Sequence, residues 1–314
     1  MSYDGAEEQM IRLVALIDIC AMLLVTGCIS RAVHNNVPQF AEAVTLATQN
    51  SQATFEIVDR KYVDIEASRL VVDYDRTGFD PNRVHHLLAS KDLQVRLDLL
   101  NALQRYASTL SDVSSDAKLQ EFDTTTKAFG QSLQTLTQTA EFKSLLKTTK
   151  AETGVAATAV DALGRWFIER KRQKELPKLI EQMQDPVAKT AELLEADIGN
   201  RPDDQGNGGN GLRAELWNEY MQGMVQQSAF IDHNKGQLDP LAKAQEIRKL
   251  PQLVDERDRA DDALRQTAES MAKLVQAHAE VMRAVKTKVD LHADISALVL
   301  EGQRIKTFYE SLQK

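Results

Sequence analysis

Apolar residues recur every three or four positions along most of this 314-residue chain. That spacing places them on one face of an α-helix and predicts a helix wherever it persists. One such face starts after Pro38, runs to about Tyr74 and ends near Gly78. A second follows Ser90 and consists of Leu93, Leu97, Leu100, Leu103, Ala107 and Leu110. No stretch of the sequence requires a strand, so the chain is predicted to be all-α.

The longest regular pattern lies towards the C-terminus. From Gln252 to Leu312 the apolar positions alternate steps of four and three, as in a coiled coil. They are Leu264, Ala268, Met271, Val275, His278, Met282, Val285, Val289 and His292. An unbroken helix here, opened by Pro251, would be about 90 Å long at roughly 1.5 Å per residue. The predicted fold is therefore an elongated antiparallel helical bundle with long, coiled-coil-like helices.

Prolines and glycines mark the expected ends of helices. Three prolines follow an aspartate, at Asp80-Pro81, Asp185-Pro186 and Asp239-Pro240. Aspartate is a favoured N-cap and proline is favoured at the first helical position, so each pair predicts a helix start. Residues 199–211 are rich in glycine and asparagine, which predicts a flexible loop and a joint between two subdomains.

A different pattern occupies the first 30 residues. Residues 13–25 form a mostly apolar run, which as a helix spans about 20 Å against about 30 Å of bilayer hydrocarbon. The run follows Arg12 and precedes Thr26-Gly27, the order found in secretory signal peptides. Asp18 interrupts the run at a cost of about 2.5 to 3.5 kcal/mol on insertion scales. The first residues are acidic, so Met10 is an alternative start of translation.

The end of this stretch, Val25-Thr26-Gly27-Cys28, resembles the lipobox of bacterial lipoproteins, in which a hydrophobic residue and two small ones precede the lipid-bearing cysteine. The resemblance is confined to this N-terminal stretch, and no family resemblance covers the rest. It implies that a signal peptidase recognises Val25, Thr26 and Gly27, cleaves before Cys28, and leaves lipid on the Cys28 thiol. Residues 1–27 would then be a signal peptide, 28–37 a tether and 38–314 the helical bundle. Ile29 rather than aspartate follows the cysteine, which in enteric-type sorting favours the outer over the inner membrane.

Charge and cysteine content exclude two classes of function. The formal net charge is −8, and loss of residues 1–27 would remove four acids and one base, which leaves −5. Such an acidic body is a poor partner for nucleic acid, where affinity comes mainly from cations at phosphates. The two cysteines are Cys20 and Cys28, so the mature body would hold no second thiol for a disulfide or a cysteine zinc site.

Two glycine and histidine patterns resemble ligand motifs, but neither predicts a site. Gly206, Gly208 and Gly211 match the spacing of a dinucleotide-binding motif, yet no apolar strand precedes them, so they are interpreted as loop. His278 and His292 are fourteen residues apart on the C-terminal seam, about 21 Å along one helix, and cannot share a metal ion. A register-fixing role and a pH-sensing role both stay open for these histidines. No metal, cofactor or catalytic residue is predicted.

The densest basic segment lies between positions 165 and 174. The residues expected to contact an anionic surface are Arg165, Trp166, Arg170, Lys171, Arg172 and Lys174. One hypothesis is that they rest on anionic lipid headgroups or on an acidic helix of a partner. The alternative is an ordinary amphipathic helix with Trp166 packed inward and its cations in water.

The sequence thus predicts a lipid-anchored lipoprotein of the bacterial envelope that faces the periplasm and acts as a non-enzymatic helical interaction or scaffold module. Its expected partners are the membrane, through the lipid, and other envelope proteins, through helix–helix contacts. The same helix–helix contacts are compatible with a homo-oligomer, and nucleic acid is not expected as a partner. One alternative is an enzyme or small-molecule-binding protein with a site inside the bundle. Another is a cytosolic helical adaptor with residues 13–25 in its core, and a third is an uncleaved signal anchor.

Overall fold

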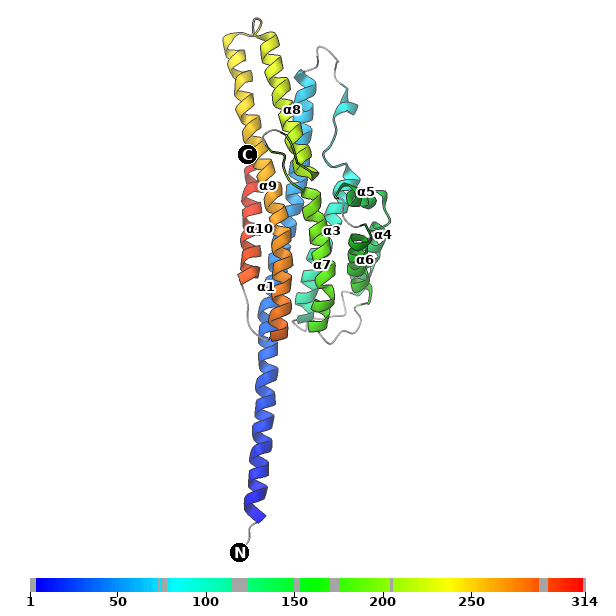
Figure 1. Ribbon diagram of the computed structural model, residues 1–314, viewed down its shortest axis with the longest axis vertical. Coiled ribbons are helices and arrows are strands. Elements are labelled where there is room, and N and C mark those ends of the chain that lie inside the picture. The colour runs from blue at the N-terminus through cyan, green and yellow to red at the C-terminus, as the bar shows by residue number, and fades with distance from the viewer. Residues whose placement is uncertain are drawn as a thin grey trace.

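The computed structural model describes residues 4–72, 74, 78, 80–114, 123–149, 153–169, 176–203, 206–287 and 293–312. Its side chains are described from Asn35 onward, apart from short stretches near the ends of elements. Every regular element within these ranges is a helix, which confirms the predicted all-α fold. The bundle is elongated, and one helix projects far beyond it (Figure 1).

Nine α-helices and one 3-10 helix make up the described chain. They are α1 (Asp4–Val72), η1 (Pro81–Arg83), α3 (Ser90–Ser114), α4 (Asp123–Leu136), α5 (Ala140–Thr148), α6 (Thr153–Glu169), α7 (Leu176–Ile198), α8 (Gly211–Asn234), α9 (Pro240–Thr287) and α10 (Ala293–Leu312).

Helix α1 is the axis of the bundle. It packs against α3, α8, α9 and α10, while α4, α5 and α6 gather beside α3 and α7 (Figure 1). The N-terminal part of α1 leaves the bundle at one end, which we call the base, and the turn between α8 and α9 forms the opposite end, the tip (Figure 1). Among the described side chains, burial on α1 begins at Asn36 and Val37, neither of which exposes any surface.

The prediction that the first helix begins at Pro38 is wrong. Helix α1 runs unbroken from Asp4 to Val72 with Pro38 inside it. A proline within a helix removes one backbone hydrogen bond and costs about 3 kcal/mol or more. Complete burial of Val37, Phe40 and Val44 around it offsets that cost, because each large apolar side chain contributes about 1.5 to 3 kcal/mol. The segment expected as a tether, 28–37, is therefore helical, and its last residues already belong to the bundle.

Two of the three Asp-Pro pairs begin helices as predicted. At the start of α9, Oδ1 of Asp239 accepts hydrogen bonds from the backbone N–H groups of Leu241 (2.8 Å) and Ala242 (3.0 Å). At η1, Oδ1 of Asp80 accepts one from the N–H of Asn82 (2.9 Å). These carboxylates satisfy N–H groups that have no partner within the helix itself.

The predicted helix starts at Pro186 and Pro251 are wrong, because both prolines lie inside helices. Pro186 lies in α7 and Pro251 lies in α9. In α7 the buried residues Met183 and Val187 flank the proline and keep the helix packed through it. In α7, packing of the apolar face thus outweighs the local preference of proline.

The C-terminal segment is not one unbroken helix. Helix α9 ends at Thr287, and α10 begins at Ala293 and returns along α9 as its antiparallel neighbour (Figure 1). The carboxylate of Glu280 on α9 accepts hydrogen bonds from the first backbone N–H groups of α10, at 3.0, 2.7 and 2.9 Å from Ala293, Asp294 and Ile295. This buried carboxylate caps α10 and fixes where the returning helix starts.

Candidate functional site

The lipobox-like residues lie on the part of α1 that projects from the base (Figure 1). The side chains of residues 25–28 lie outside the described part of the structure. The first buried side chain that the structure describes on α1 is that of Asn36. Cleavage before Cys28 would therefore remove none of the described core.

The basic segment begins within α6, at Arg165. Helix α6 ends at Glu169 and α7 begins at Leu176, both at the base end of the bundle (Figure 1). Nη2 of Arg165 lies 2.8 Å from Oδ2 of Asp161, one turn earlier on α6, and about half of the Arg165 side chain is exposed. The side chain of Trp166 and all of Arg170, Lys171, Arg172 and Lys174 lie outside the described residues. Contact of this segment with an anionic surface stays a prediction.

His278 and His292 do not share one helix, contrary to the predicted seam. His278 lies in α9 and is fully buried, whereas His292 falls between α9 and α10, outside the described residues. The Nε2 atom of His278 lies 2.7 Å from the Tyr106 hydroxyl of α3, and its Nδ1 lies 2.6 Å from Oε1 of Gln184 on α7. The ring edge of Phe40 on α1 packs against it, with ring centroids 5.7 Å apart. One imidazole thereby joins four helices.

Burial keeps this histidine neutral. Desolvation lowers the pKa of His278 from about 6.5 to about 3, because the folded interior disfavours the imidazolium. Desolvation likewise holds the pKa of the fully buried Tyr106 well above its ordinary value. A neutral imidazole has one donor and one acceptor, which matches an accepting Gln184 oxygen and a donating Tyr106 hydroxyl. These contacts favour the register-fixing role of His278 over a sensor that would change charge between pH 5 and 8.

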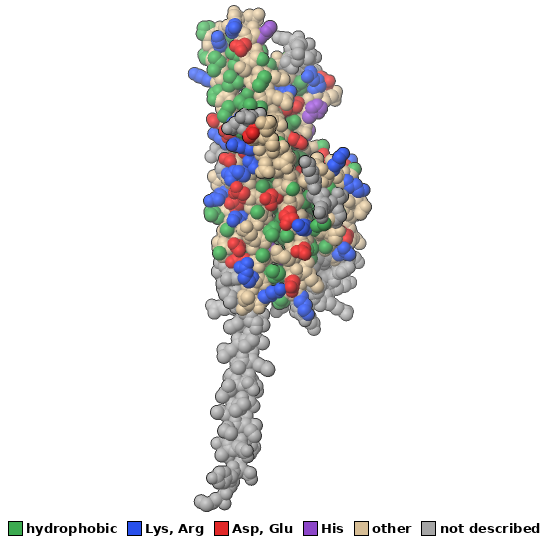
Figure 2. Space-filling model, in the orientation of Figure 1, with side chains coloured by type: hydrophobic (Ala, Val, Ile, Leu, Met, Phe, Trp, Pro, Cys, Tyr) green, Lys and Arg blue, Asp and Glu red, His purple; other side chains and the backbone are tan. Residues whose placement is uncertain are grey.

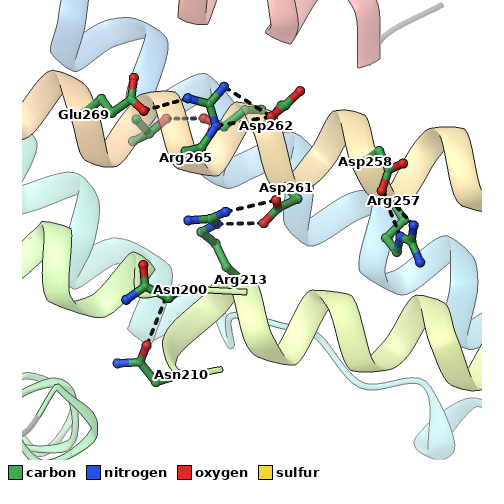
Figure 3. A network of polar contacts seen from close by, with 11 residues as sticks. Asn200, Asn210, Arg213, Arg257, Asp258, Asp261, Asp262, Arg265 and Glu269 are labelled. Atoms are coloured by element: carbon green, nitrogen blue, oxygen red, sulfur yellow. Dashed lines mark hydrogen bonds and ion pairs between the residues drawn. The ribbon is translucent and has the colours of Figure 1, made fainter. Parts of the chain in front are cut away.

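Two buried ion pairs also connect helices in the core, and neither pair was predicted from the sequence. The guanidinium of Arg96 on α3 donates two hydrogen bonds to Asp197 on α7, at 2.7 and 2.6 Å, and both residues are buried. Arg213 on α8 does the same to Asp261 on α9, at 2.7 and 3.0 Å (Figure 3). One signal was available, because Arg96 stands at three-four spacing between apolar positions of its helix face. Its partner 101 residues away carries no local signal.

The glycine-rich segment is a closed loop within the part of it that the structure describes. Asn200 and Asn210 pair across its neck through two backbone hydrogen bonds of 3.0 and 2.9 Å. The backbone N–H of Asn200 also donates to Oδ1 of Asn210 at 3.0 Å (Figure 3). Gly199 and Gly211, at the two ends, have φ values of 67° and 69°. Helices on both sides of the loop contribute to one hydrophobic core. The loop therefore connects α7 to α8 within one packed body, and no dinucleotide-binding strand precedes it.

An open groove of about 580 Å³ lies between α1, α3 and α10, towards the base. Leu46 and Val299 line it together with hydroxyl and amide side chains and the carboxylates of Glu42 and Asp112. On the face shown in Figure 2, Lys and Arg side chains alternate with Asp and Glu, and apolar side chains gather towards the tip. The groove is the surface on which a small-molecule function would be tested first.

No family model, no curated protein and no solved structure matches this chain. Within the described residues, no three His, Cys, Asp or Glu side chains form a group that could hold a metal ion. None of the helices, as far as their side chains are described, is long and apolar enough to span a bilayer, and the run at 13–25 lies outside that part.

Proposed function

We propose that this chain is a lipid-anchored lipoprotein of the bacterial envelope whose helical bundle serves as a non-enzymatic interaction or scaffold module. Signal peptidase cleaves before Cys28, and the Cys28 thiol carries the lipid. The bundle then faces the periplasm and binds other envelope proteins through helix–helix contacts.

One observation carries the proposal: the lipobox-like stretch and the bundle are separate parts of α1. The apolar run and Cys28 precede the bundle, and the part of α1 that holds them projects from the base (Figure 1). Asn36 and Val37 are the first buried side chains in the described part of α1. This separation supports an N-terminal anchor over an adaptor that keeps residues 13–25 in its core.

The same geometry orients the bundle. Asn36 lies eight positions after Cys28, which is about 12 Å of helix at roughly 1.5 Å per residue. The base would therefore lie close to the lipid surface, and the α8–α9 tip would point away from it. Val225, Leu241 and Ile247 on these two helices are 66%, 68% and 46% exposed. Apolar side chains left exposed on helices support a role in binding other helices.

Metabolic labelling tests the anchor with a matched pair of variants. The chain has two cysteines, so Cys28→Ser and Cys20→Ser make the same chemical change eight residues apart. We expect a labelled fatty acid to appear on the wild-type chain and on C20S, and to be lost from C28S. Equal labelling of C28S and C20S, or no labelling of the wild-type chain in a bacterial host, would refute lipidation at Cys28.

A further inference from the structure

A small hollow near the C-terminal end of α1 has the donors of an anion site. It has a volume of about 180 Å³ and lies between α1, α8 and the segment that joins η1 to α3. Its lining residues are Glu66, Arg69, Leu70, Arg83, His85 and Gln226. Three of these six carry a guanidinium or an imidazole, the groups that most often bind oxyanions.

A buried carboxylate holds the segment that carries Arg83 and His85. Asp59 on α1 is only 7% exposed. One of its oxygens accepts a hydrogen bond from the backbone N–H of Leu88 (2.9 Å), and the other lies 2.8 Å from Nδ1 of His86. Burial of a carboxylate is costly unless it is well paired, so these two contacts of Asp59 fix the path of the segment. Arg83 and His85 are thereby kept beside α1.

The remaining cation, Arg69, is oriented from two helices. One terminal nitrogen of its guanidinium pairs with Glu219 on α8 and lies 3.6 Å from Glu66, and its Nε donates to Oε1 of Gln226 (3.1 Å). The backbone N–H of Arg83 donates to the carbonyl oxygen of Asp80 (3.1 Å), and its side chain, which is exposed, makes no hydrogen bond or ion pair with any residue that the structure describes. The hollow therefore combines one guanidinium held in place with a second one that has no side-chain partner among the described residues.

The charges around the hollow decide what it can accept. The described charged groups that face it are Glu66 and Arg69 on α1, Glu219 on α8, and Arg83. Their formal charges cancel while His85 is neutral, and a protonated His85 would add one positive charge. A bound anion is therefore favoured most when His85 carries a proton.

We propose that this hollow binds a small oxyanion, the phosphate, sulfate or carboxylate group of a ligand, between Arg69, Arg83 and His85. Binding is coupled to protonation of His85. The site lies far from the base, and it does not depend on lipidation of Cys28.

Calorimetric titration of the full chain in detergent tests the site. Inorganic phosphate and acetate serve as separate probes, so that a response to one alone identifies the phosphate or the carboxylate class. We expect saturable binding of at least one of them that R83Q weakens about tenfold or more, since a charge-assisted pair is lost. The matched control is R283Q, which removes an exposed arginine near the base end of α9 and should leave the affinity unchanged within about twofold.

Sulfate tests the coupling, because its own charge is constant over the pH range used. We expect it to bind more tightly at about pH 5.5 than at about pH 7.5, and H85Q to abolish that difference. Absence of saturable binding of phosphate, sulfate and acetate would overturn the site. Equal loss of affinity in R83Q and R283Q would do the same, since it would show non-specific attraction. A pH dependence that persists in H85Q would overturn the coupling.

Discussion

The hydroxyl oxygen of Tyr106 lies 2.7 Å from Nε2 of His278, although the two residues are 172 positions apart in the chain. Neither side chain exposes more than 1% of its surface. The contact ties α3 to α9, and Gln184 on the other ring nitrogen adds α7. A polar contact between fully buried groups is satisfied in one alignment of these helices, so it fixes their register.

Removal of one hydroxyl tests this role. Tyr106→Phe leaves a buried ring nitrogen of His278 without its partner, and we expect the free energy of unfolding to fall by about 1 to 3 kcal/mol. Tyr220→Phe is the matched control, because the Tyr220 hydroxyl is equally buried and has no hydrogen-bond partner among the described residues. We expect Y220F to leave the stability unchanged or to raise it. Equal losses in urea unfolding of the two variants would contradict the role of the Tyr106–His278 contact.

The lowered pKa of His278 predicts a pH dependence of stability with a defined sign. The folded protein holds this pKa at about 3, whereas an unfolded histidine titrates near 6.5, so the unfolded chain binds more protons between these values. Stability is therefore fully present above about pH 6.5 and falls below it, by up to about 1.4 kcal/mol per pH unit. Urea unfolding at about pH 7 and about pH 5.5 measures the slope. His278→Gln should remove this share of it, and an unchanged slope in H278Q would show that another group is responsible.

The buried pair between Arg96 and Asp197 should be far more sensitive to truncation than an exposed pair. Asp197→Ala leaves the buried Arg96 guanidinium without its carboxylate, with only the Nη1 hydrogen bond to the backbone carbonyl of Asp92 (2.8 Å) remaining, and we expect a loss of about 3 to 5 kcal/mol. Asp258→Ala removes an aspartate that is about half exposed and paired with Arg257, and should cost less than about 1 kcal/mol. Replacing both Arg96 and Asp197 with apolar residues should recover much of the loss, because no uncompensated charge remains. Failure of that double variant to exceed D197A in melting temperature would count against the argument.

Substitutions at two glycines of the 199–211 loop distinguish the cost of backbone strain from the cost of a steric clash. Gly199 and Gly208 both have positive φ, at 67° and 79°. A Cβ atom on Gly199 would lie 2.2 Å from the carbonyl oxygen of Asn210, whereas one on Gly208 would meet nothing within 4 Å. We expect Gly208→Ala to cost about 1 to 2 kcal/mol for the backbone alone, and Gly199→Ala to cost clearly more because the pairing of Asn200 with Asn210 must open. Similar melting temperatures of the two variants would show that the pairing of Asn200 with Asn210 opens at little cost.

Much of the fold could be predicted from local sequence. The three-four spacing identified the helical class, and Asp80 and Asp239 identified two helix starts that the structure confirms. The errors arose where packing overrules a local preference. Pro38 and Pro186 lie inside helices where apolar residues around them are buried, which a residue-by-residue propensity does not include. Pro251 lies inside α9 although its apolar neighbours Leu250 and Leu253 are only half-buried.

Less of the candidate sites could be predicted, because they depend on residues that are distant in sequence. The seam through His278 and His292 was predicted to be continuous, since a periodic pattern does not reveal that the chain turns back between α9 and α10. The partners of Arg96, Arg213 and His278 lie 101, 48 and 172 residues away. Only the lipobox-like stretch could be recognised locally, because its residues are contiguous.

Mass spectrometry of the chain recovered from bacterial membranes tests the central proposal most directly. We predict a mature protein that begins at Cys28, has lost residues 1–27, and carries a diacylglycerol-sized addition on its first residue. An intact N-terminus at Met1 or Met10 would contradict the proposal. In the membrane fraction it would indicate an uncleaved signal anchor, and in the soluble fraction it would indicate a cytosolic helical adaptor.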